Sequence, residues 1–383
     1  MMSIRRQTTR VLFLVQNLTA DDIALVRARE LARRLPERYD CRIAERRSAG
    51  AVAEIWSFWR AVRLFRPDVI CCQNEGLTAL VPALLARWRH GVPFVIDTGD
   101  IAEELARKLI SGWFARWKMI LTERLTLRTA AAIVVRGTFH RRYLAARGRR
   151  HVWVVQDGVD VEDRPAERDQ ALRMKLGLSN RFVVGVMGSS IWNERLQLCY
   201  GWELVETIAL LKEPKVSGLM VGGGDGIAWL KRRAAELGVQ DRIVFTGYVP
   251  HRQVRSYLQQ MDTALCTQTN DPVGWARTTG KLPEYLAAGC YVLASAVGEA
   301  VLVLPPSMLV PYDGPGRDNS YPGRLAERIR QLVPARRRLA AARPTNRAIA
   351  RARFDYRVLS TKLAGCFGSL AGRGPGDGAR PCA

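Results

Sequence analysis

Short apolar runs alternate with longer amphipathic segments along most of this chain. In the first half, residues 11–16, 68–73, 93–97 and 132–135 have the β-rich, apolar character of buried strands. Helical patterns separate these runs, including a long one over 101–130. Strands separated by helices at this spacing predict βαβ crossovers, and therefore a parallel sheet that is covered by helices on both faces.

The same alternation restarts after a polar, proline-containing segment at 161–170, which is typical of a linker between cores. We therefore predict the α/β class, with two Rossmann-like parallel-sheet domains at 1–157 and 158–350 that face each other across a cleft. A C-terminal helix is expected at 351–370. The glycine-rich segment 371–383 has too few apolar residues to pack, so a disordered tail is expected there.

The bulk composition narrows the class of protein. A net charge of +23 over 383 residues is spread across both halves, which fits an enzyme that handles phosphorylated substrates beside an anionic membrane, or simply an arginine-rich proteome. No nucleic-acid partner is expected, because no helix-turn-helix, paired zinc spacing or RNA-binding aromatic signature is present.

Cysteine usage and hydropathy bear on location. Most of the eight cysteines lie in apolar runs and none has metal-ligand spacing, which indicates a reducing compartment. No segment approaches 18 uninterrupted apolar residues, and the apolar run near the N-terminus is too short for a signal peptide. We expect a cytoplasmic protein, with peripheral contact at the inner face of the cell membrane as an open alternative.

The run from Thr278 to Ser295 carries the strongest chemical signal. A polar loop is followed by Lys281, by Glu284 one helical turn later, by a small-residue helix that ends at Gly289, and by a buried strand. This order places an ammonium and a carboxylate at the start of a helix beside a strand end, where open α/β sheets bind nucleotides.

Four motifs together resemble a known family. VVQDGVD (154–160), VVGVMGS (183–189), LMVGGGDG (219–226) and KLPEYLAAGCYVLAS (281–295) follow the order of the donor domain in GT-B glycosyltransferases of the family-4 type, group 1. The resemblance covers roughly 155–300. It implies a retaining, metal-independent glycosyltransferase, with no cofactor and no metal site, that uses a UDP- or GDP-type nucleotide sugar.

The resemblance also implies roles for three charged residues. Glu284 matches the glutamate that accepts hydrogen bonds from the donor ribose, a task that suits the two oxygens of a carboxylate. Lys281 and Arg195 match the cations that neutralise the leaving diphosphate. The alternatives are that Glu284 is a solvated helix residue paired with Lys281, and that both cations are ordinary surface groups.

The loop before the helix offers further phosphate contacts. Thr278, Thr279 and Gly280 present amides and hydroxyls, although a threonine there also serves as an ordinary N-cap. The resemblance departs at Ala276, where the family has a second glutamate that contacts the transferred sugar. This departure leaves the identity of the donor sugar undetermined.

Four other positions are expected to bind the nucleotide. Gly188 follows the first strand of the second domain, and Gly223 lies in the GGGDG turn, which lacks the later glycine of a dinucleotide fingerprint. Gly247 and Tyr248 resemble the segment that lines the base pocket.

The first half offers candidates for the acceptor. The loop 17–19 follows the opening strand, and Asp97 and Asp100 follow a later strand at the same sheet edge. Either aspartate has the chemistry to polarise an acceptor hydroxyl, but an aspartate that caps the next helix is the commoner arrangement.

A basic amphipathic stretch at 108–128 mixes three aromatic side chains with lysine and arginine. Such a helix either lies on an anionic membrane or packs its apolar stripe on its own sheet. We expect a lipid-linked or saccharide acceptor of the cell envelope. The rival interpretations are another nucleotide-sugar enzyme, such as an epimerase, and a protein that binds nucleic acid or another polyanion.

Overall fold

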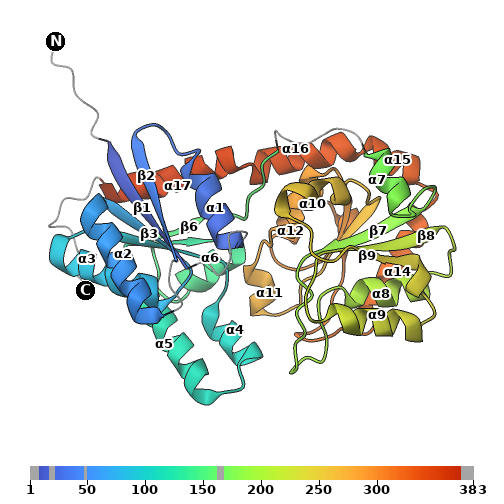
Figure 1. Ribbon diagram of the computed structural model, residues 1–383, viewed down its shortest axis with the longest axis horizontal. Helices are drawn as coiled ribbons and strands as arrows, with labels where there is room; N and C mark the ends of the chain where they lie inside the picture. The colour runs from blue at the N-terminus through green and yellow to red at the C-terminus, as the bar shows by residue number, and fades with distance from the viewer. Residues whose placement is uncertain (1–7, 17–21, 47–49, 162–167, 372–383) are drawn as a thin grey trace, which may run out of the picture. The chain divides into compact units, whose positions relative to one another are not determined.

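The computed structural model describes residues 8–16, 22–46, 50–161 and 168–371. The chain divides into two compact units (Figure 1). Unit 1 comprises residues 1–158 together with 356–383, and unit 2 comprises Val159–Asp355. The expected acceptor loop at 17–19 and nearly all of the expected tail lie outside the described residues.

Unit 1 is a Rossmann-like α/β unit. Its elements are β1 Thr9–Val15, α1 Ile23–Ala32, β2 Tyr39–Glu45, α2 Ala51–Phe65, β3 Val69–Gln73, α3 Leu77–His90, β4 Phe94–Thr98, α4 Ala102–Leu109, α5 Trp113–Thr129, β5 Ala132–Val135, α6 Thr138–Ala145, β6 Val152–Val154 and α17 Tyr356–Ala371.

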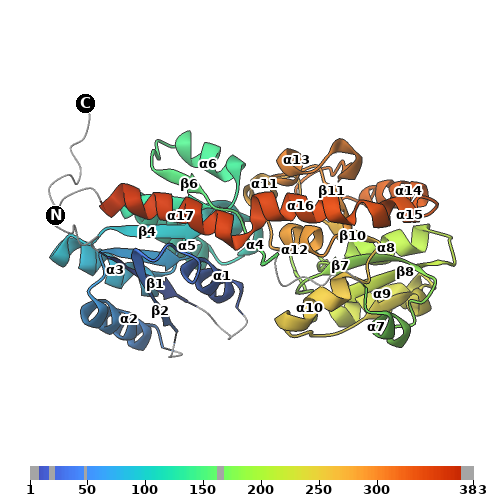
Figure 2. The ribbon, with the colours of Figure 1, turned by 90° about the horizontal axis from the view of Figure 1, so that it is seen from above.

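The six strands of unit 1 are parallel and lie in the order β2-β1-β3-β4-β5-β6. Successive strand residues point to opposite faces, so Phe13 packs with α1 and α17, whereas Leu12 and Leu14 pack with α2 and α3. Figure 2 shows α17 running along the sheet. Both faces are covered, which explains the almost continuous apolar runs of these strands.

The helical pattern predicted over 101–130 forms two helices. α4 ends at Leu109, Ile110 is extended, and Gly112 is the N-cap of α5. Glycine is a poor helix-interior residue, and the sequence Ser111-Gly112 lets the chain reverse. The prediction of one helix was therefore wrong at this point.

Unit 2 repeats the architecture. Its strands are β7 Phe182–Met187, β8 Val216–Val221, β9 Ile243–Phe245, β10 Thr263–Cys266, β11 Tyr291–Ser295 and β12 Leu309–Val310. Its helices are α7 Gln170–Lys175, α8 Trp202–Leu210, α9 Ile227–Glu236, α10 His251–Leu258, α11 Pro272–Ala276, α12 Lys281–Ala287, α13 Ala300–Val303, α14 Tyr321–Leu332, α15 Arg336–Ala341 and α16 Arg343–Phe354, with 3₁₀ turns at Gln240–Arg242 and Pro306–Met308.

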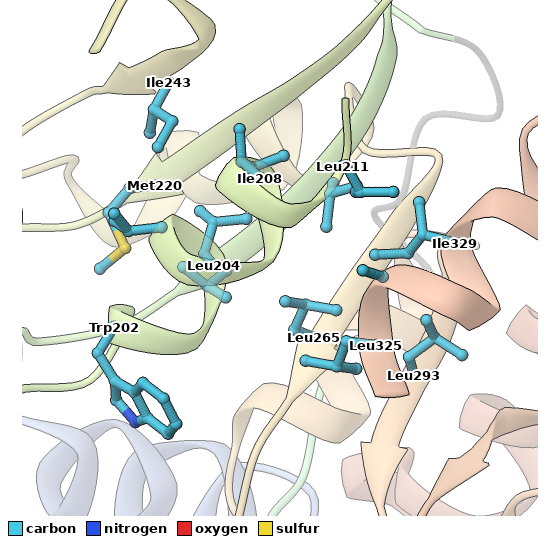
Figure 3. Close-up of a cluster of buried hydrophobic side chains, with 14 of the residues drawn as sticks. Trp202, Leu204, Ile208, Leu211, Met220, Ile243, Leu265, Leu293, Leu325 and Ile329 are labelled. Carbon is cyan, nitrogen blue, oxygen red and sulfur yellow. The ribbon is translucent and has the colours of Figure 1, made fainter. Parts of the chain in front are cut away.

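The sheet of unit 2 is also six-stranded and parallel, in the order β12-β11-β10-β7-β8-β9. Trp202 and Ile208 of α8 pack with Leu325 of α14 and with Leu265 and Leu293 of the strands on one face (Figure 3). Helices α10, α12 and α16 pack on the other face. The prediction of two Rossmann-like parallel-sheet domains is confirmed.

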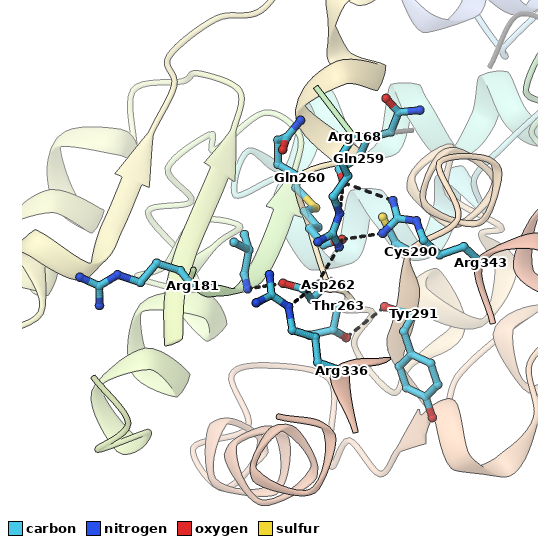
Figure 4. A network of polar contacts seen from close by, with 12 residues as sticks. Arg168, Arg181, Gln259, Gln260, Asp262, Thr263, Cys290, Tyr291, Arg336 and Arg343 are labelled. Carbon is cyan, nitrogen blue, oxygen red and sulfur yellow. Dashed lines mark hydrogen bonds and ion pairs between the residues drawn. The ribbon is translucent and has the colours of Figure 1, made fainter. Parts of the chain in front are cut away.

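A buried carboxylate organises the amino-terminal edge of this sheet. Asp262 accepts a 2.7 Å ion-pair contact from Arg168, a 3.2 Å contact from Arg336 and a 2.9 Å hydrogen bond from the Val183 amide (Figure 4). The same arginine, Arg168, also donates to the carbonyl of Gln259, just after α10. These contacts join α7, α10 and α15 to the strands, and they lie at the edge opposite the strand carboxyl ends.

The C-terminal stretch predicted as one helix at 351–370 is divided at Asp355. α16 packs against α12 in unit 2, whereas α17 packs against α1 in unit 1. The Ser360 hydroxyl donates to the Leu31 carbonyl, and the Tyr39 hydroxyl donates to the Ala364 carbonyl. The last helix therefore completes the first unit of the chain.

Candidate functional site

The strand order identifies where a ligand belongs on unit 2. From β7 the chain proceeds to β8 and β9 on one side, and then returns to place β10 on the other side. In open α/β sheets such a switch point leaves a crevice at the carboxyl ends of the strands. Gly188 directly follows β7, and the loop that leads to Lys281 follows β10.

The Lys281 side chain occupies this switch point. Its ammonium lies 3.1 Å from the centre of the Tyr200 ring, a cation–π contact. A Cβ added to Gly188 would lie 2.8 Å from the Lys281 Cε and 3.2 Å from its Nζ. Glycine at this position thus gives the ammonium room against the backbone that follows β7.

The electrostatics around Lys281 are unusual for a lysine. Burial lowers its pKa to about 8, although Cys266 and Glu203 act in the opposite direction. Burial also raises the pKa of the Glu203 carboxyl, whose Oε2 accepts a 3.1 Å hydrogen bond from the Gly201 amide. A partly desolvated cation of this kind is suited to an anionic ligand such as a diphosphate.

Glu284 lies one turn further along α12. Its carboxylate is 3.7 Å from the Nε2 of His251, at the start of α10, and its side chain is 13% exposed. The alternative of a simple helix pair with Lys281 is not what the structure shows, because Lys281 lies over Tyr200 and against Gly188. The two charged groups of α12 therefore have different neighbours: the turn after β7 for Lys281, and the start of α10 for Glu284.

The glycine turns beyond β8 and β9 continue the same edge. Gly222 forms an isolated bridge with Gly247, and a Cβ on Gly223 would lie 3.4 Å from the Tyr248 amide nitrogen. Tyr248 is 70% exposed. The expected nucleotide residues thus follow the strand order β10, β7, β8 and β9, and the three strands from β7 to β9 span about 10 Å.

The GGGDG turn has a clear packing role. A Cβ on Gly222 would lie 2.2 Å from the Gly188 carbonyl oxygen, and Gly222 and Gly188 both have positive φ, at 130° and 141°. The backbone after β8 can approach the Gly188 carbonyl this closely only where residue 222 has no side chain. Packing therefore explains Gly222 without a dinucleotide-binding role, while the nucleotide contact of Gly223 stays a prediction.

Arg195 lies in the loop that connects β7 to α8. It is exposed in a turn that is closed by a bridge between Asn193 and Leu198. The neighbouring amide of Trp192 donates to Asp225, which ties this turn to the loop after β8. Its role toward a diphosphate stays a prediction.

No threonine of the loop before α12 is the N-cap of that helix. Gly280 is the N-cap residue and makes no side-chain cap bond, while Thr278 is buried. Thr279 has a φ of 42°, and its hydroxyl lies 3.8 Å from the Cys266 sulfur. The N-cap alternative for the threonines was therefore wrong, and their phosphate role stays a prediction.

Ala276 ends α11 and is completely buried. The helix is opened by Asp271, whose carboxylate accepts a 2.8 Å bond from the Gly274 amide. The small side chain thus fits an enclosed position, and a glutamate there would have to be accommodated inside the unit.

In unit 1, Asp97 is enclosed and fully paired. Its carboxylate lies 2.8 Å from Arg27 and 3.5 Å from Arg136, and it accepts from Gln73 at 3.2 Å. Burial alone would raise the pKa of this carboxyl, but the two guanidinium groups hold the pKa below its ordinary value. Because Asp97 is 0% exposed, it cannot touch an acceptor, and its expected catalytic role is corrected to a structural one.

Neither aspartate caps the following helix. The first amides of α4, those of Ala102 and Glu103, both donate to the carboxylate of Glu123 at 2.7 Å. The cap is supplied from α5, far along the chain, so the capping alternative was wrong. Asp100 is half-buried, with its carbonyl accepting from Thr98, and its role stays a prediction.

Three residues at the two switch points were not anticipated from the sequence. Tyr200 and Glu203 surround Lys281 in unit 2. Glu75 follows β3 at the β1/β3 switch point of unit 1, and burial raises its pKa to about 8. Only the position of Glu75, two residues after the end of a predicted strand, offered a signal in the sequence.

Two family models match the chain. A glycosyl transferase 4-like domain matches residues 3–158, and glycosyl transferases group 1 matches residues 181–333. The chain belongs to the group 1 glycosyltransferases. The second match contains Gly188, Lys281 and Glu284.

Relatives of this glycosyltransferase are known in bacteria. The 2-deoxystreptamine glucosyltransferase of Streptomyces kanamyceticus is 31% identical over 55% of the chain and 52% of the relative. The 2-deoxystreptamine N-acetyl-D-glucosaminyltransferase of Streptomyces fradiae is 26% identical over 65% of the chain and 60% of the relative. The matches thus span little more than half the length of these curated relatives.

The solved structure of Anabaena HepE in complex with UDP has the same fold. It is 18% identical, with a TM-score of 0.71, and the match covers 94% of this chain and 100% of HepE. HepE has also been solved in complex with UDP-glucose. The fold of the chain is therefore that of a GT-B glycosyltransferase.

Proposed function

We propose that this group 1 glycosyltransferase transfers a sugar from a UDP-sugar to a hydroxyl group of a saccharide, an aminocyclitol or a lipid-linked acceptor. The observation that carries the proposal is the placement of Lys281 against Gly188, at the switch point of unit 2, with Glu284 one turn away. The two family models describe glycosyl transferases, so we do not propose an epimerase or a polyanion-binding protein.

The charges of the site support a nucleoside diphosphate ligand. Cleavage of the sugar–phosphate bond develops negative charge on the diphosphate, and a fixed ammonium at the position of Lys281 stabilises that charge. The Glu284 carboxylate offers two acceptor oxygens to the two ribose hydroxyls. Tyr248, which is exposed beyond β9, offers a ring on which the base can stack. Arg195, Thr278, Thr279, Gly223 and Gly247 are proposed as further contacts.

Uracil is the base we propose, because the HepE structures contain UDP and UDP-glucose. The acceptor is proposed to bind at the carboxyl edge of unit 1. Glu75 lies at this edge close to the β1/β3 switch point, and Asp100 follows β4. Two relatives act on 2-deoxystreptamine by name, which makes a small aminocyclitol a specific acceptor to test. The expected cleft between the two domains stays a prediction.

Retention of anomeric configuration and independence of metal are parts of the proposal. In the described part of the chain, no group of three or more His, Cys, Asp or Glu side chains is placed to hold a metal ion. The tests are NMR of the product anomer and activity in the presence of a chelator. A product of inverted configuration, or loss of activity with the chelator, would contradict these parts of the proposal.

The central test is calorimetric titration of the full chain with UDP, together with hydrolysis of a panel of nucleotide sugars. We expect UDP to bind, and Glu284→Gln to weaken its binding by about tenfold or more, because charge-assisted bonds to the ribose are lost. Glu206→Gln is the matched control, since Glu206 is similarly enclosed at 16% exposure but pairs with Arg233 and Arg317. Equal weakening by both variants, or no affinity for UDP, would refute the proposal.

A further inference from the structure

The helix α5 is turned with its apolar side outward. Its stripe of large apolar side chains consists of Trp113, Phe114, Trp117, Leu121 and Leu125, which are 77%, 62%, 57%, 49% and 41% exposed. Their spacing places them on one side of the helix. The sequence alternative, in which this stripe packs on the sheet of unit 1, is therefore wrong.

The buried side of α5 is polar, and its contacts fix the orientation of the helix. The buried residues are Thr122, Glu123 and Thr126. The Glu123 carboxylate accepts from the amides of Ala102 and Glu103 at 2.7 Å each, and so caps α4. Turning the apolar stripe inward would expose this carboxylate and leave the first amides of α4 without it, so the stripe remains outside.

α5 begins, next to its aromatic residues, at a turn that projects from unit 1. In Figure 1 the connection between α4 and α5 lies at the end of the pair that points away from the strands of unit 1. Leu109, at 39% exposure, adds another apolar side chain beside this turn. Arg116 donates to the carbonyls of Ile110 and Ser111, which holds the turn in place.

Cations outnumber carboxylates on α5 and the helices that lie beside it, and one of these cations, Arg124 of α5, is paired with Glu103 of α4 at 2.9 Å. α2 and α3 contact each other, and α3 contacts α5, so the three helices form one layer. Together they carry eight lysine and arginine residues and two carboxylates. Within these three helices, all of which the structure describes, both carboxylates are enclosed, with Glu54 at 2% and Glu123 at 4% exposure.

Further exposed tryptophans lie on the same layer, with Trp56 of α2 at 65% and Trp88 of α3 at 82% exposure. The layer therefore offers apolar side chains and cations without an exposed carboxylate. A second copy of the chain would present the same positive charge, which opposes self-association through this face. An anionic lipid surface complements both the charge and the apolar stripe, because it accepts aromatic and leucine side chains below its phosphate groups.

We infer that this layer docks unit 1 on an anionic lipid bilayer, with the stripe of α5 inserted at the level of the headgroups and the cations beside the phosphates. No helix among the described residues is long and apolar enough to cross a membrane. The contact is therefore peripheral. It depends on side chains of unit 1 and not on the donor site of unit 2, so it can be tested separately from sugar transfer.

The test is sedimentation of the full chain with vesicles of phosphatidylcholine containing about one third phosphatidylglycerol, and with vesicles of phosphatidylcholine alone. We expect binding to the anionic vesicles that weakens with added salt. The triple variant Trp113→Ser, Phe114→Ser, Trp117→Ser should lower the vesicle partition coefficient by about tenfold or more. Met174→Ser is the matched control, because Met174 is 66% exposed on α7 of unit 2.

The exposed stripe residues can be replaced without removing core contacts, so the triple variant should retain its melting temperature and its affinity for UDP. Failure of the wild-type chain to bind anionic vesicles, or equal binding by the triple variant, would overturn the inference. The inference would also be overturned if sedimentation velocity showed a dimer that the triple variant does not form. The same holds if the wild-type chain bound single-stranded DNA in place of vesicles and the triple variant did not. Loss of UDP binding with intact vesicle binding would instead contradict the proposed function.

Discussion

Raising the pH above 8 should weaken the binding of UDP, because the Lys281 ammonium loses its proton there. Burial lowers the pKa of Lys281 to about 8. With that pKa, about 91% of the molecules carry the charge at pH 7 and about 9% carry it at pH 9. If only the ammonium form stabilises the diphosphate, affinity falls by about tenfold over this interval, which corresponds to about 1.4 kcal/mol.

The assay is isothermal titration of the full chain with UDP between pH 7 and pH 9, in buffers of different ionisation enthalpy. A bound diphosphate favours the ammonium form, so binding at pH 8 should be accompanied by uptake of about half a proton. Lys281→Met should bind UDP about 10- to 100-fold more weakly at pH 7 and should lack the pH dependence. Glu284→Gln is the control, because it should weaken binding and keep the pH dependence.

The same lysine has a predictable effect on stability. Its folded-state pKa is lower than the value of about 10.4 in the unfolded chain, so between pH 8 and about pH 10.4 the unfolded state binds more protons. The contribution of Lys281 to the free energy of unfolding therefore rises with pH in this window, and the Lys281→Met variant should lack that rise.

UDP affinity that stays constant to pH 9, or that falls equally in Lys281→Met, would refute the reasoning on ligand binding.

Three other substitutions test the remaining geometry. Gly188→Ala should weaken UDP binding by about tenfold and lower the free energy of unfolding by about 1–3 kcal/mol, because φ is 141° and the added Cβ would lie 2.8 Å from the Lys281 Cε. The control is Gly238→Ala, where a Cβ meets no heavy atom within 4 Å. This control should leave the UDP affinity measured by calorimetry unchanged. Asp97→Asn should lower the free energy of urea unfolding by about 3–5 kcal/mol at pH 7, because a buried ion pair loses one partner. The native pKa of Asp97 is lowered, so its contribution is present above about pH 4, and the difference from wild type should shrink as the pH falls through the native pKa. Ala276→Glu should lower the melting temperature without raising transferase activity, because the position is 0% exposed; a stable and more active variant would contradict this.

The α/β architecture could be predicted from the chain because each strand is a short apolar run and each helix is a longer amphipathic one. Lys281 and Glu284 could also be proposed, since their spacing on one helix is a local property of the sequence. By contrast, the approach of Gly188 to Lys281 depends on β7 and β10 being neighbours at a switch point. Strand order is set by long-range pairing, and no local pattern encodes it.

Asp97 and α5 also show the difference between what the sequence predicts and what tertiary contacts determine. An aspartate after a strand fits a base, a helix cap or an ion pair, and the choice was made by Arg27, which reaches it from α1. The amphipathic pattern of α5 fits burial or exposure of its apolar stripe equally well. The hydrogen bonds that the first amides of α4 donate to Glu123 decided between them, because a buried carboxylate must remain with its donors. The sequence by itself thus determined the elements and their chemistry, while tertiary contacts determined which side chains are enclosed, paired or left for a partner.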